Sequence, residues 1–181
     1  MEQNLKDRIL RIKAIAYDLD GVATDGSIIP VGPRPEDLVR IVNAKDSFAS
    51  RVASGKGYIM AVISGGDTPA LRSRCLHMGI QEENLFLGAR GKLDIFNAFC
   101  QQHGLDPAEV AYFGDDIPDT QVLRACGLGI APADAVQEAK DAADYVTQLP
   151  GGRGCIREGI ELIMRTQGTW VFDENHYEKL Y

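Results

Sequence analysis

The sequence predicts an α/β protein built on a doubly wound parallel sheet. Short apolar runs alternate with helical patterns along the chain, as in sheets that helices cover on both faces. Acidic residues directly follow two of the apolar runs, at the strand ends where such sheets bind ligands. No repeat or linker divides the chain, so residues 1–181 are expected to form one Rossmann-like domain with a single core.

The strands of this sheet are expected at residues 12–17, 58–63, 85–87, 110–113, 128–131 and 145–147. Helices are expected between them at residues 68–78, 92–103, 118–125, 135–142 and 154–166, with one more between residues 20 and 64. Gly104 follows one helix and suits its C-terminal end. The run Asp106-Pro107-Ala108-Glu109 predicts a capped helical turn, with Pro at its first position and Glu at its third.

Two segments interrupt the alternation of strands and helices. Residues 27–43 contain Pro30, Pro33 and Pro35 beside apolar pairs, which predicts a β-hairpin flap projecting from the sheet. Residues 168–181 form a tail with four aromatic side chains, Trp170, Phe172, Tyr177 and Tyr181. The tail is expected to pack either on its own domain or on a neighbouring subunit.

Composition limits the partners that this chain can have. The formal net charge is −7 and no basic run is present, so nucleic acid is not expected as a partner. The N-terminus is charged and no apolar stretch reaches the length of a membrane span, so we expect a cytoplasmic protein without a membrane partner. The cysteines form no CxxC pair and are expected to be buried free thiols: Cys75, Cys100, Cys126 and Cys155.

Two carboxylates end the first predicted strand. Asp18 and Asp20 alternate with Leu19, so both can face one crevice at the sheet edge. One carboxylate could attack a phosphorus atom while the other transfers a proton. Taken alone, the pattern also fits a turn that uses aspartate for its geometry.

Three more acids follow the fourth predicted strand. If this strand lies beside the first, Asp115, Asp116 and Asp119 converge with Asp18 and Asp20. Such a cluster repels itself without a cation, and Mg²⁺ prefers these hard oxygen ligands. Asp115 is the best candidate for a second side-chain ligand. Asp119 is expected to support the ligands without binding the ion, and Asp116 could cap the following helix.

Phosphate-binding groups are expected at two further strand ends. Ser64 offers a hydroxyl, and Gly65 and Gly66 offer backbone amides to phosphoryl oxygens. Lys92 begins a predicted helix, where it can neutralise phosphate charge and hold the nucleophile. Taken alone, Ser64 could be a helix cap, and Lys92 could be a lysine on the protein surface.

The order Asp-x-Asp, Ser, Lys and Gly-Asp-Asp-x-x-Asp resembles the haloacid dehalogenase superfamily of phosphatases over residues 12–168. The resemblance implies an aspartyl-phosphate on Asp18, proton transfer by Asp20, and Mg²⁺ held by Asp18, the Asp20 carbonyl and Asp115. Predicted elements fill the intervals between Asp20, Ser64 and Lys92, so this HAD-like domain is expected to have no cap.

Smaller motifs resemble the 3-deoxy-D-manno-octulosonate 8-phosphate phosphatases: Asp20-Gly21-Val22-x-Thr24-Asp25-Gly26, Lys45-Asp46 and Gly151-Gly152-Arg153-Gly154. That subfamily implies hydrolysis of this ester in lipopolysaccharide precursor synthesis, and homotetramers that close each site with a neighbour. It also implies Thr24 as a support for the site and Asp46 as a substrate contact. Asp67 and Ser47 depart from the subfamily pattern, which leaves a nonulosonate 9-phosphate or another sugar phosphate as an alternative substrate.

The carboxylate of a sugar-acid substrate requires a positive partner. Arg153 is the first candidate because it lies in a glycine-rich turn at a predicted helix N-terminus, which itself attracts anions. Arg74 is the second candidate for this partner, and the other available arginines are Arg72, Arg90 and Arg157. Two functions of other classes stay open: a phospho-acceptor regulatory domain, and a catalytically idle member that acts as an oligomeric scaffold.

Overall fold

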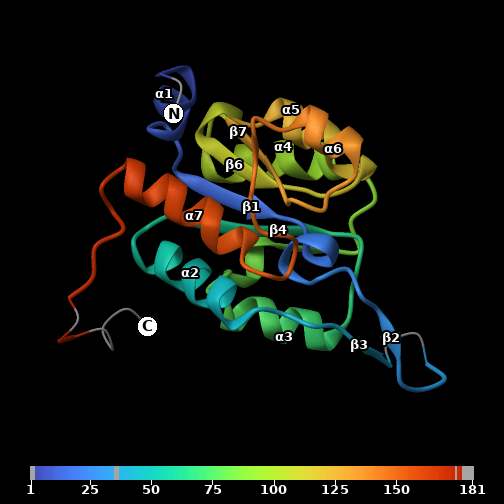
Figure 1. Cartoon of the computed structure of the whole chain (residues 1–181). Helices are drawn as coiled ribbons and strands as arrows, with labels where there is room; N and C mark the ends of the chain where they lie inside the picture. The colour runs from blue at the N-terminus through green and yellow to red at the C-terminus, as the bar shows by residue number, and fades with distance from the viewer. Residues whose placement is uncertain (1–2, 35–36, 174, 177–181) are drawn as a thin grey trace.

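The computed structural model of the chain describes residues 3–34, 37–173 and 175–176. Among these residues, six parallel strands form one sheet in the order β5-β4-β1-β6-β7-β8 (Figure 1). The strands are β1 Ala14–Tyr17, β4 Ile59–Ser64, β5 Leu85–Leu87, β6 Val110–Phe113, β7 Leu128–Ala131 and β8 Tyr145–Val146. Each strand overlaps a predicted apolar run, so the predicted doubly wound α/β sheet is confirmed.

Helices cover both faces of this sheet (Figure 1). On one face lie α2 Ala44–Gly55, α3 Pro69–His77 and α7 Cys155–Thr166, and on the other lie α4 Lys92–His103, α5 Thr120–Ala125 and α6 Gln137–Ala142. Short helical turns occur at Leu19–Ala23, Glu82–Asn84, Pro107–Glu109 and Ile117–Asp119. Helix α1, Gln3–Ile9, was not predicted, because only Ile9 of its seven residues is buried and the segment has no apolar periodicity.

The alternation of side chains along the strands divides the core into two clusters. In β1, Ile15 and Tyr17 pack toward α2 and α7, whereas Ala14 and Ala16 pack toward α4 and α5. Because both faces are covered, all four strand residues of β1 are buried. The four cysteines are buried and free, as predicted.

The expected flap segment contains a two-stranded antiparallel sheet that projects from the main body (Figure 1). Strand β2, Ile29–Pro30, pairs with β3, Leu38–Val39, and an isolated bridge joins Thr24 to Val42 at the base. Pro35, which was part of the prediction for this segment, lies outside the described residues.

The tail packs in part on its own domain. Trp170 and Phe172 lie against the core, with their ring centroids 4.9 Å apart in an edge-on arrangement. Tyr177 and Tyr181 lie outside the described residues. Across the described ranges, no helix has both the length and the apolar character that a bilayer span requires.

Gly159 allows α7 to approach the sheet closely. A Cβ atom at this position would lie 2.5 Å from the ring of Phe113, which is fully buried. Gly159→Ala is therefore expected to lower the free energy of unfolding by about 1–3 kcal/mol, because the close-packed core must move to accept the methyl group. Urea unfolding measures the change.

Ser73→Ala, at an exposed position of α3, is the control and is expected to stay within about 0.5 kcal/mol of the wild type. Equal stabilities of the two variants would contradict the close approach of α7 to Phe113.

Candidate active site

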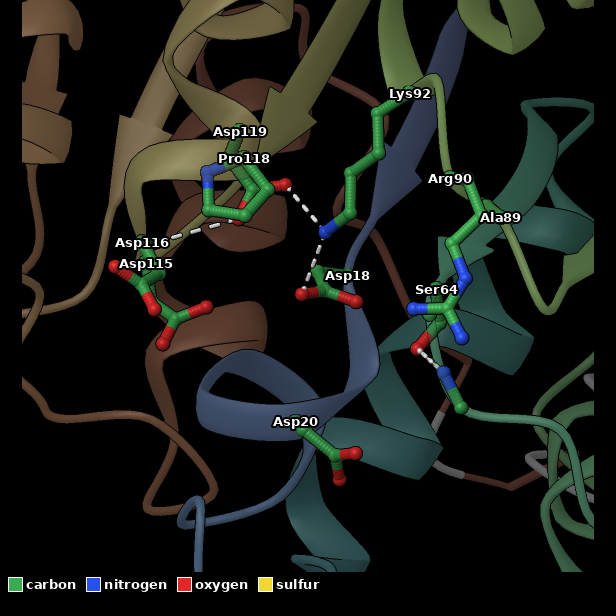
Figure 2. A pocket seen from close by; sticks show the side chains of 12 residues that line it. Asp18, Asp20, Ser64, Ala89, Arg90, Lys92, Asp115, Asp116, Pro118 and Asp119 are labelled. Atoms are coloured by element: carbon green, nitrogen blue, oxygen red, sulfur yellow. Dashed lines mark hydrogen bonds and ion pairs between the residues drawn. The ribbon is translucent and has the colours of Figure 1, made fainter.

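The strand order brings three chemically active strand ends together. Strand β1 lies between β4 and β6, so the predicted proximity of the first and fourth predicted strands is confirmed. A pocket of about 350 Å³ opens at their carboxyl ends (Figure 2). Its lining contains twelve residues, which are Asp18, Asp20, Ser64, Gly65, Gly66, Ala89, Arg90, Lys92, Asp115, Asp116, Pro118 and Asp119.

Asp18 is the buried carboxylate at the centre of this pocket. Its backbone N–H donates to the Phe113 carbonyl at 3.0 Å, which fixes it to the end of β6. Its Oδ1 accepts the N–H of Leu19 at 2.7 Å, and its Oδ2 lies 2.8 Å from Nζ of Lys92. Burial raises the pKa of Asp18, against the opposing attraction of the Lys92 ammonium.

Lys92 bridges two carboxylates from its position at the start of α4. Its Nζ lies 2.8 Å from both Asp18 Oδ2 and Asp119 Oδ1, and its side chain is 6% exposed. Burial lowers the pKa of Lys92, but the negative charges of Asp18 and Asp119 raise it by more, so the pKa of Lys92 lies above its usual value. Tyr112 donates to the same Asp119 Oδ1 at 2.6 Å. Sequence reasoning missed Tyr112, although a tyrosine in a buried strand requires a hydrogen-bond partner.

Asp115, at the pocket wall, forms no ion pair with a described residue. Its Oδ1 is buried without a hydrogen bond to any described residue, and its Oδ2 faces the backbone of Gly21. Burial and the charges of Asp18 and Asp119 raise the pKa of Asp115 to about 7. A buried carboxylate oxygen of this kind requires either a proton or a cation.

These carboxylates fit a divalent cation. Asp18, Asp115 and Asp119 each offer one oxygen, and the three oxygens lie within 4.8 Å of one another. Carboxylate oxygens are ligands suited to hard divalent ions, and Asp115 Oδ1 is the orphaned atom that such an ion would satisfy. Asp119 already accepts from Lys92 and Tyr112, which leaves Asp18 and Asp115 as the more open ligands.

The remaining predicted support residues have defined contacts. Asp116 caps the turn at Ile117–Asp119 by accepting the N–H of Ile117 at 2.7 Å, as was considered from the sequence. Thr24 is fully buried, and its Oγ1 donates to Asp20 Oδ1 at 3.3 Å and accepts the N–H of Gly26 at 3.2 Å. It therefore braces the loop that follows β1.

Ser64 and its two glycines form the opposite wall. The Ser64 side chain is 1% exposed, and its Oγ accepts the N–H of Gly66 at 3.3 Å. Figure 2 shows the guanidinium of Arg90 directed toward the side of the pocket on which Ser64 lies, and both residues line the pocket. Arg90 is exposed and has no ion pair with any described residue.

Asp20 lines the pocket beside an arginine that sequence reasoning missed. Nε of Arg40 donates to Asp20 Oδ1 at 2.7 Å and Nη2 donates to Oδ2 at 3.1 Å. Arg40 follows β3 in the flap, and nothing in its local sequence indicates where the flap folds back. Only the tertiary structure brings it to the strand end.

Three predicted substrate contacts lie outside this pocket and have other partners. Asp46 is 1% exposed and accepts the N–H groups of Gly154 and Arg157, so it caps the N-terminus of α7. Arg153 pairs with Asp25 at 2.9 Å. The Arg74 guanidinium donates to the hydroxyl of Ser47.

Comparison with known proteins gives matching results from sequence and structure. A model of the haloacid dehalogenase-like hydrolase family matches residues 91–152. The 3-deoxy-D-manno-octulosonate 8-phosphate phosphatase KdsC of Escherichia coli K12 is 36% identical over 157 residues, which are 87% of this chain and 81% of that protein.

Solved structures are also similar over nearly the whole chain. The Moraxella catarrhalis 3-deoxy-D-manno-octulosonate 8-phosphate phosphatase, in complex with a magnesium ion, a phosphate ion and KDO, has a TM-score of 0.87 at 27% identity, covering 94% of this chain and 95% of that one. The cobalt-bound Haemophilus influenzae deoxy-D-mannose-octulosonate 8-phosphate phosphatase (YrbI) has a TM-score of 0.84 at 32% identity, covering 93% and 96%.

Asp115→Asn is expected to stabilise the metal-free protein at pH 8 by about 1–2 kcal/mol, or about 2–8 °C in Tm. The pKa of Asp115 is raised from its ordinary value of about 4 to about 7, so between these pH values the folded state holds a proton that the unfolded state has lost. At pH 8 the folded state must keep this carboxylate ionised in a place that disfavours its charge. The contribution of Asp115 to the free energy of unfolding of the wild type therefore falls as pH rises from about 4 to about 7. Thermal unfolding in EDTA at pH 5 and pH 8 measures it.

With saturating Mg²⁺ the wild type should instead be more stable than Asp115→Asn, because the wild type gains stability from the bound ion and Asp115→Asn gains much less. Asp141→Asn on the exposed face of α6 is the control and should follow the wild type throughout. An unchanged pH dependence in Asp115→Asn would show that Asp115 ionises normally.

Proposed function

This chain belongs to the haloacid dehalogenase-like hydrolases and is a phosphatase, and on that premise we propose that it hydrolyses 3-deoxy-D-manno-octulosonate 8-phosphate to the free sugar acid and phosphate. One observation carries the chemistry: Asp18, Asp115, Lys92 and Ser64 reach a single pocket from four separate elements. The substrate follows from the relatives named above, which carry this activity in their names.

Asp18 is proposed as the nucleophile. Its carboxylate is held on both sides, by the N–H of Leu19 and by the ammonium of Lys92, so little reorganisation is needed before attack. As Asp18 attacks in line, one bond forms from its oxygen to phosphorus and the bond from phosphorus to the sugar oxygen breaks. Ser64 and Lys92 would hold the remaining phosphoryl oxygens and stabilise their charge.

Asp20 is proposed as the general acid and base. It lines the same pocket two residues after the nucleophile, where it can give a proton to the departing sugar oxygen. It would then take a proton from the water that hydrolyses the aspartyl-phosphate on Asp18. The second step returns both carboxyl groups to their starting state.

Mg²⁺ is the proposed cation, held by Asp18, the backbone carbonyl of Asp20 and Asp115, with Asp119 supporting them. When bound, it would supply positive charge beside the phosphoryl oxygens and offset the repulsion among the carboxylates. Lys92 provides one positive charge among these acids and already contacts two of them. A cation would therefore offset negative charge that Lys92 alone does not balance among these carboxylates.

Arg90 is the proposed partner of the sugar-acid carboxylate. It is the arginine of the pocket lining, and it is not engaged by another described carboxylate. A free guanidinium can bind a carboxylate with two parallel hydrogen bonds. Arg153, the first choice from the sequence, pairs with Asp25 in this chain, so it would reach a substrate only if that pair opened or if it acted in another subunit.

A homotetramer is proposed for the assembly, as the subfamily resemblance implies. The flap exposes a group of large apolar side chains, which are Ile28, Ile29, Val31, Val39 and Ile41. Exposed apolar groups of this kind favour contact with another protein surface. Analytical ultracentrifugation would measure the assembly directly.

A panel of phosphate esters tests the proposed function. The octulosonate 8-phosphate should be hydrolysed with the highest kcat/KM, above a nonulosonate 9-phosphate and a hexose 6-phosphate, and activity should be lost in EDTA and restored by Mg²⁺. Phosphate release measures each rate. Asp18→Asn should lower kcat by at least about 10³-fold, because an amide is a poor nucleophile.

If the nonulosonate 9-phosphate has the highest kcat/KM, the proposed substrate is wrong, but the proposed phosphatase mechanism is unaffected. Near wild-type turnover by Asp18→Asn would reject the nucleophile. A stable phosphorylated protein without turnover would support the phospho-acceptor alternative, and no reaction with any ester would support the idle scaffold.

Arg90→Ala should raise KM for the octulosonate ester by about 10-fold with a small change in kcat, because one charged contact to the ground state is lost. A phosphate ester without a carboxylate should be much less affected. Arg124→Ala, an exposed arginine of α5, is the control. If Arg153→Ala raises KM for the octulosonate ester more than Arg90→Ala does, Arg153 is the partner of the substrate carboxylate, as the sequence suggested.

A further inference from the structure

We propose that Arg40 is a positioning residue for Asp20, through which the flap sets the geometry of proton transfer to the leaving group. The inference rests on the proposed function, in which Asp20 is the proton donor. Arg40 is not among the residues that line the pocket, and it donates hydrogen bonds to the Asp20 carboxyl group, so its action on proton transfer would pass through that group.

The contacts between the two side chains fix the plane of the Asp20 carboxyl group. Arg40 uses Nε and Nη2 to donate to the two different oxygens, at 2.7 and 3.1 Å. Two parallel hydrogen bonds from a planar group restrain both the position and the rotation of a carboxylate. The Arg40 side chain is 10% exposed, so water screens this pair less than it would a surface pair.

The same contacts distinguish the two oxygens of Asp20. Oδ1 accepts from Arg40 Nε and, at 3.3 Å, from the hydroxyl of Thr24. Oδ2 accepts from Arg40 Nη2, and no other described donor contacts it. A carboxyl oxygen has about two lone-pair sites, so Oδ2 keeps one that is open. The geometry therefore assigns proton exchange with the substrate to Oδ2.

The base of the flap holds Arg40 in place from both sides. Val39, directly before it, pairs with Ile29 in the flap sheet, and Val42, two residues after it, bridges to Thr24. Thr24 belongs to the loop that carries Asp20, so one short stretch of backbone links the flap to the carboxyl group it orients. Displacement of the flap would move the Arg40 guanidinium group. The Asp20 carboxyl group would then be restrained by its hydrogen bond with Thr24 alone.

Gly66 leaves room for this pair beside the phosphate-binding turn. A Cβ atom at Gly66 would lie 3.4 Å from Asp20 Oδ2 and 3.5 Å from Arg40 Nη2. The oriented oxygen is thus next to the turn that follows Ser64. This places Oδ2 at the side of the pocket where the proposed phosphoryl group would bind.

The test compares leaving groups, because only a poor leaving group requires the proton of Asp20. Arg40→Ala should lower kcat/KM for a hexose 6-phosphate by about 10- to 100-fold and for 4-nitrophenyl phosphate by less than about 3-fold. Arg40→Lys should recover part of the loss, because its point charge cannot hold both oxygens. Thermal unfolding with Mg²⁺ checks that each variant is folded.

Three results would overturn the proposal. Equal losses with both esters would assign Arg40 to structure or phosphate binding. A loss confined to the sugar-acid ester, with the hexose ester unaffected, would make Arg40 a contact of the substrate carboxylate. Unchanged or higher kcat/KM for the hexose ester would show that Asp20 needs no positioning. If Arg40→Ala fails to fold, the same comparison on Arg40→Lys decides.

Two further variants separate this proposal from the proposed function. Arg34→Ala removes an exposed arginine that pairs with Asp37 in the same flap, and it should leave both esters unchanged. Asp20→Asn should show the same dependence on the leaving group as Arg40→Ala, but more strongly. If Asp20→Asn shows none, the role of Asp20 in the proposed function fails; if Asp20→Asn shows it and Arg40→Ala does not, only the positioning role fails.

Discussion

Crowding of negative charge at the ends of β1 and β6 is the constraint on which the rest of the site depends. Asp18, Asp115 and Asp119 have oxygens within 4.8 Å of one another in a largely buried place. Lys92 provides one compensating charge and contacts two of the three carboxylates. Burial, together with the charges of Asp18 and Asp119, raises the pKa of Asp115, whose Oδ1 has no hydrogen-bond partner among the described residues. The site is therefore arranged for a state in which a cation is bound.

Glycine makes this crowding sterically possible. Gly21 has a φ of +87°, and a Cβ atom there would lie 1.9 Å from Asp115 Oδ2. The loop after β1 is in turn backed by Gly151, where a Cβ atom would lie 1.9 Å from the Gly21 carbonyl oxygen. The glycine-rich turn before α7 thus packs directly behind the loop after β1, and the absence of a side chain at Gly151 has a steric reason.

The flap belongs to the site as well as to the surface. Its base is tied to the loop after β1 by the bridge between Thr24 and Val42, and its arginine engages Asp20. A rigid sheet therefore positions the proposed nucleophile, whereas a small projecting hairpin orients the proposed proton donor (Figure 1). Both proposed chemical groups therefore follow β1, but the orientation of Asp20 also depends on Arg40 from a two-stranded hairpin, which is marginal without other support.

The sequence by itself determined the fold class, the strands of the sheet and the residues at their ends. Apolar periodicity is a local property, and acids directly after buried strands are costly unless they form a site. Asp18, Asp20 and Asp115 could be found in this way, whereas Ser64 and Lys92 were identified from their order relative to these acids, because each alone also fits a structural role. Arg40, Tyr112 and the choice of Arg90 over Arg153 depended on tertiary structure, because side-chain pairing across distant segments leaves no periodic pattern. Where a flap folds back, and which arginine is already paired, is decided only when the whole chain packs.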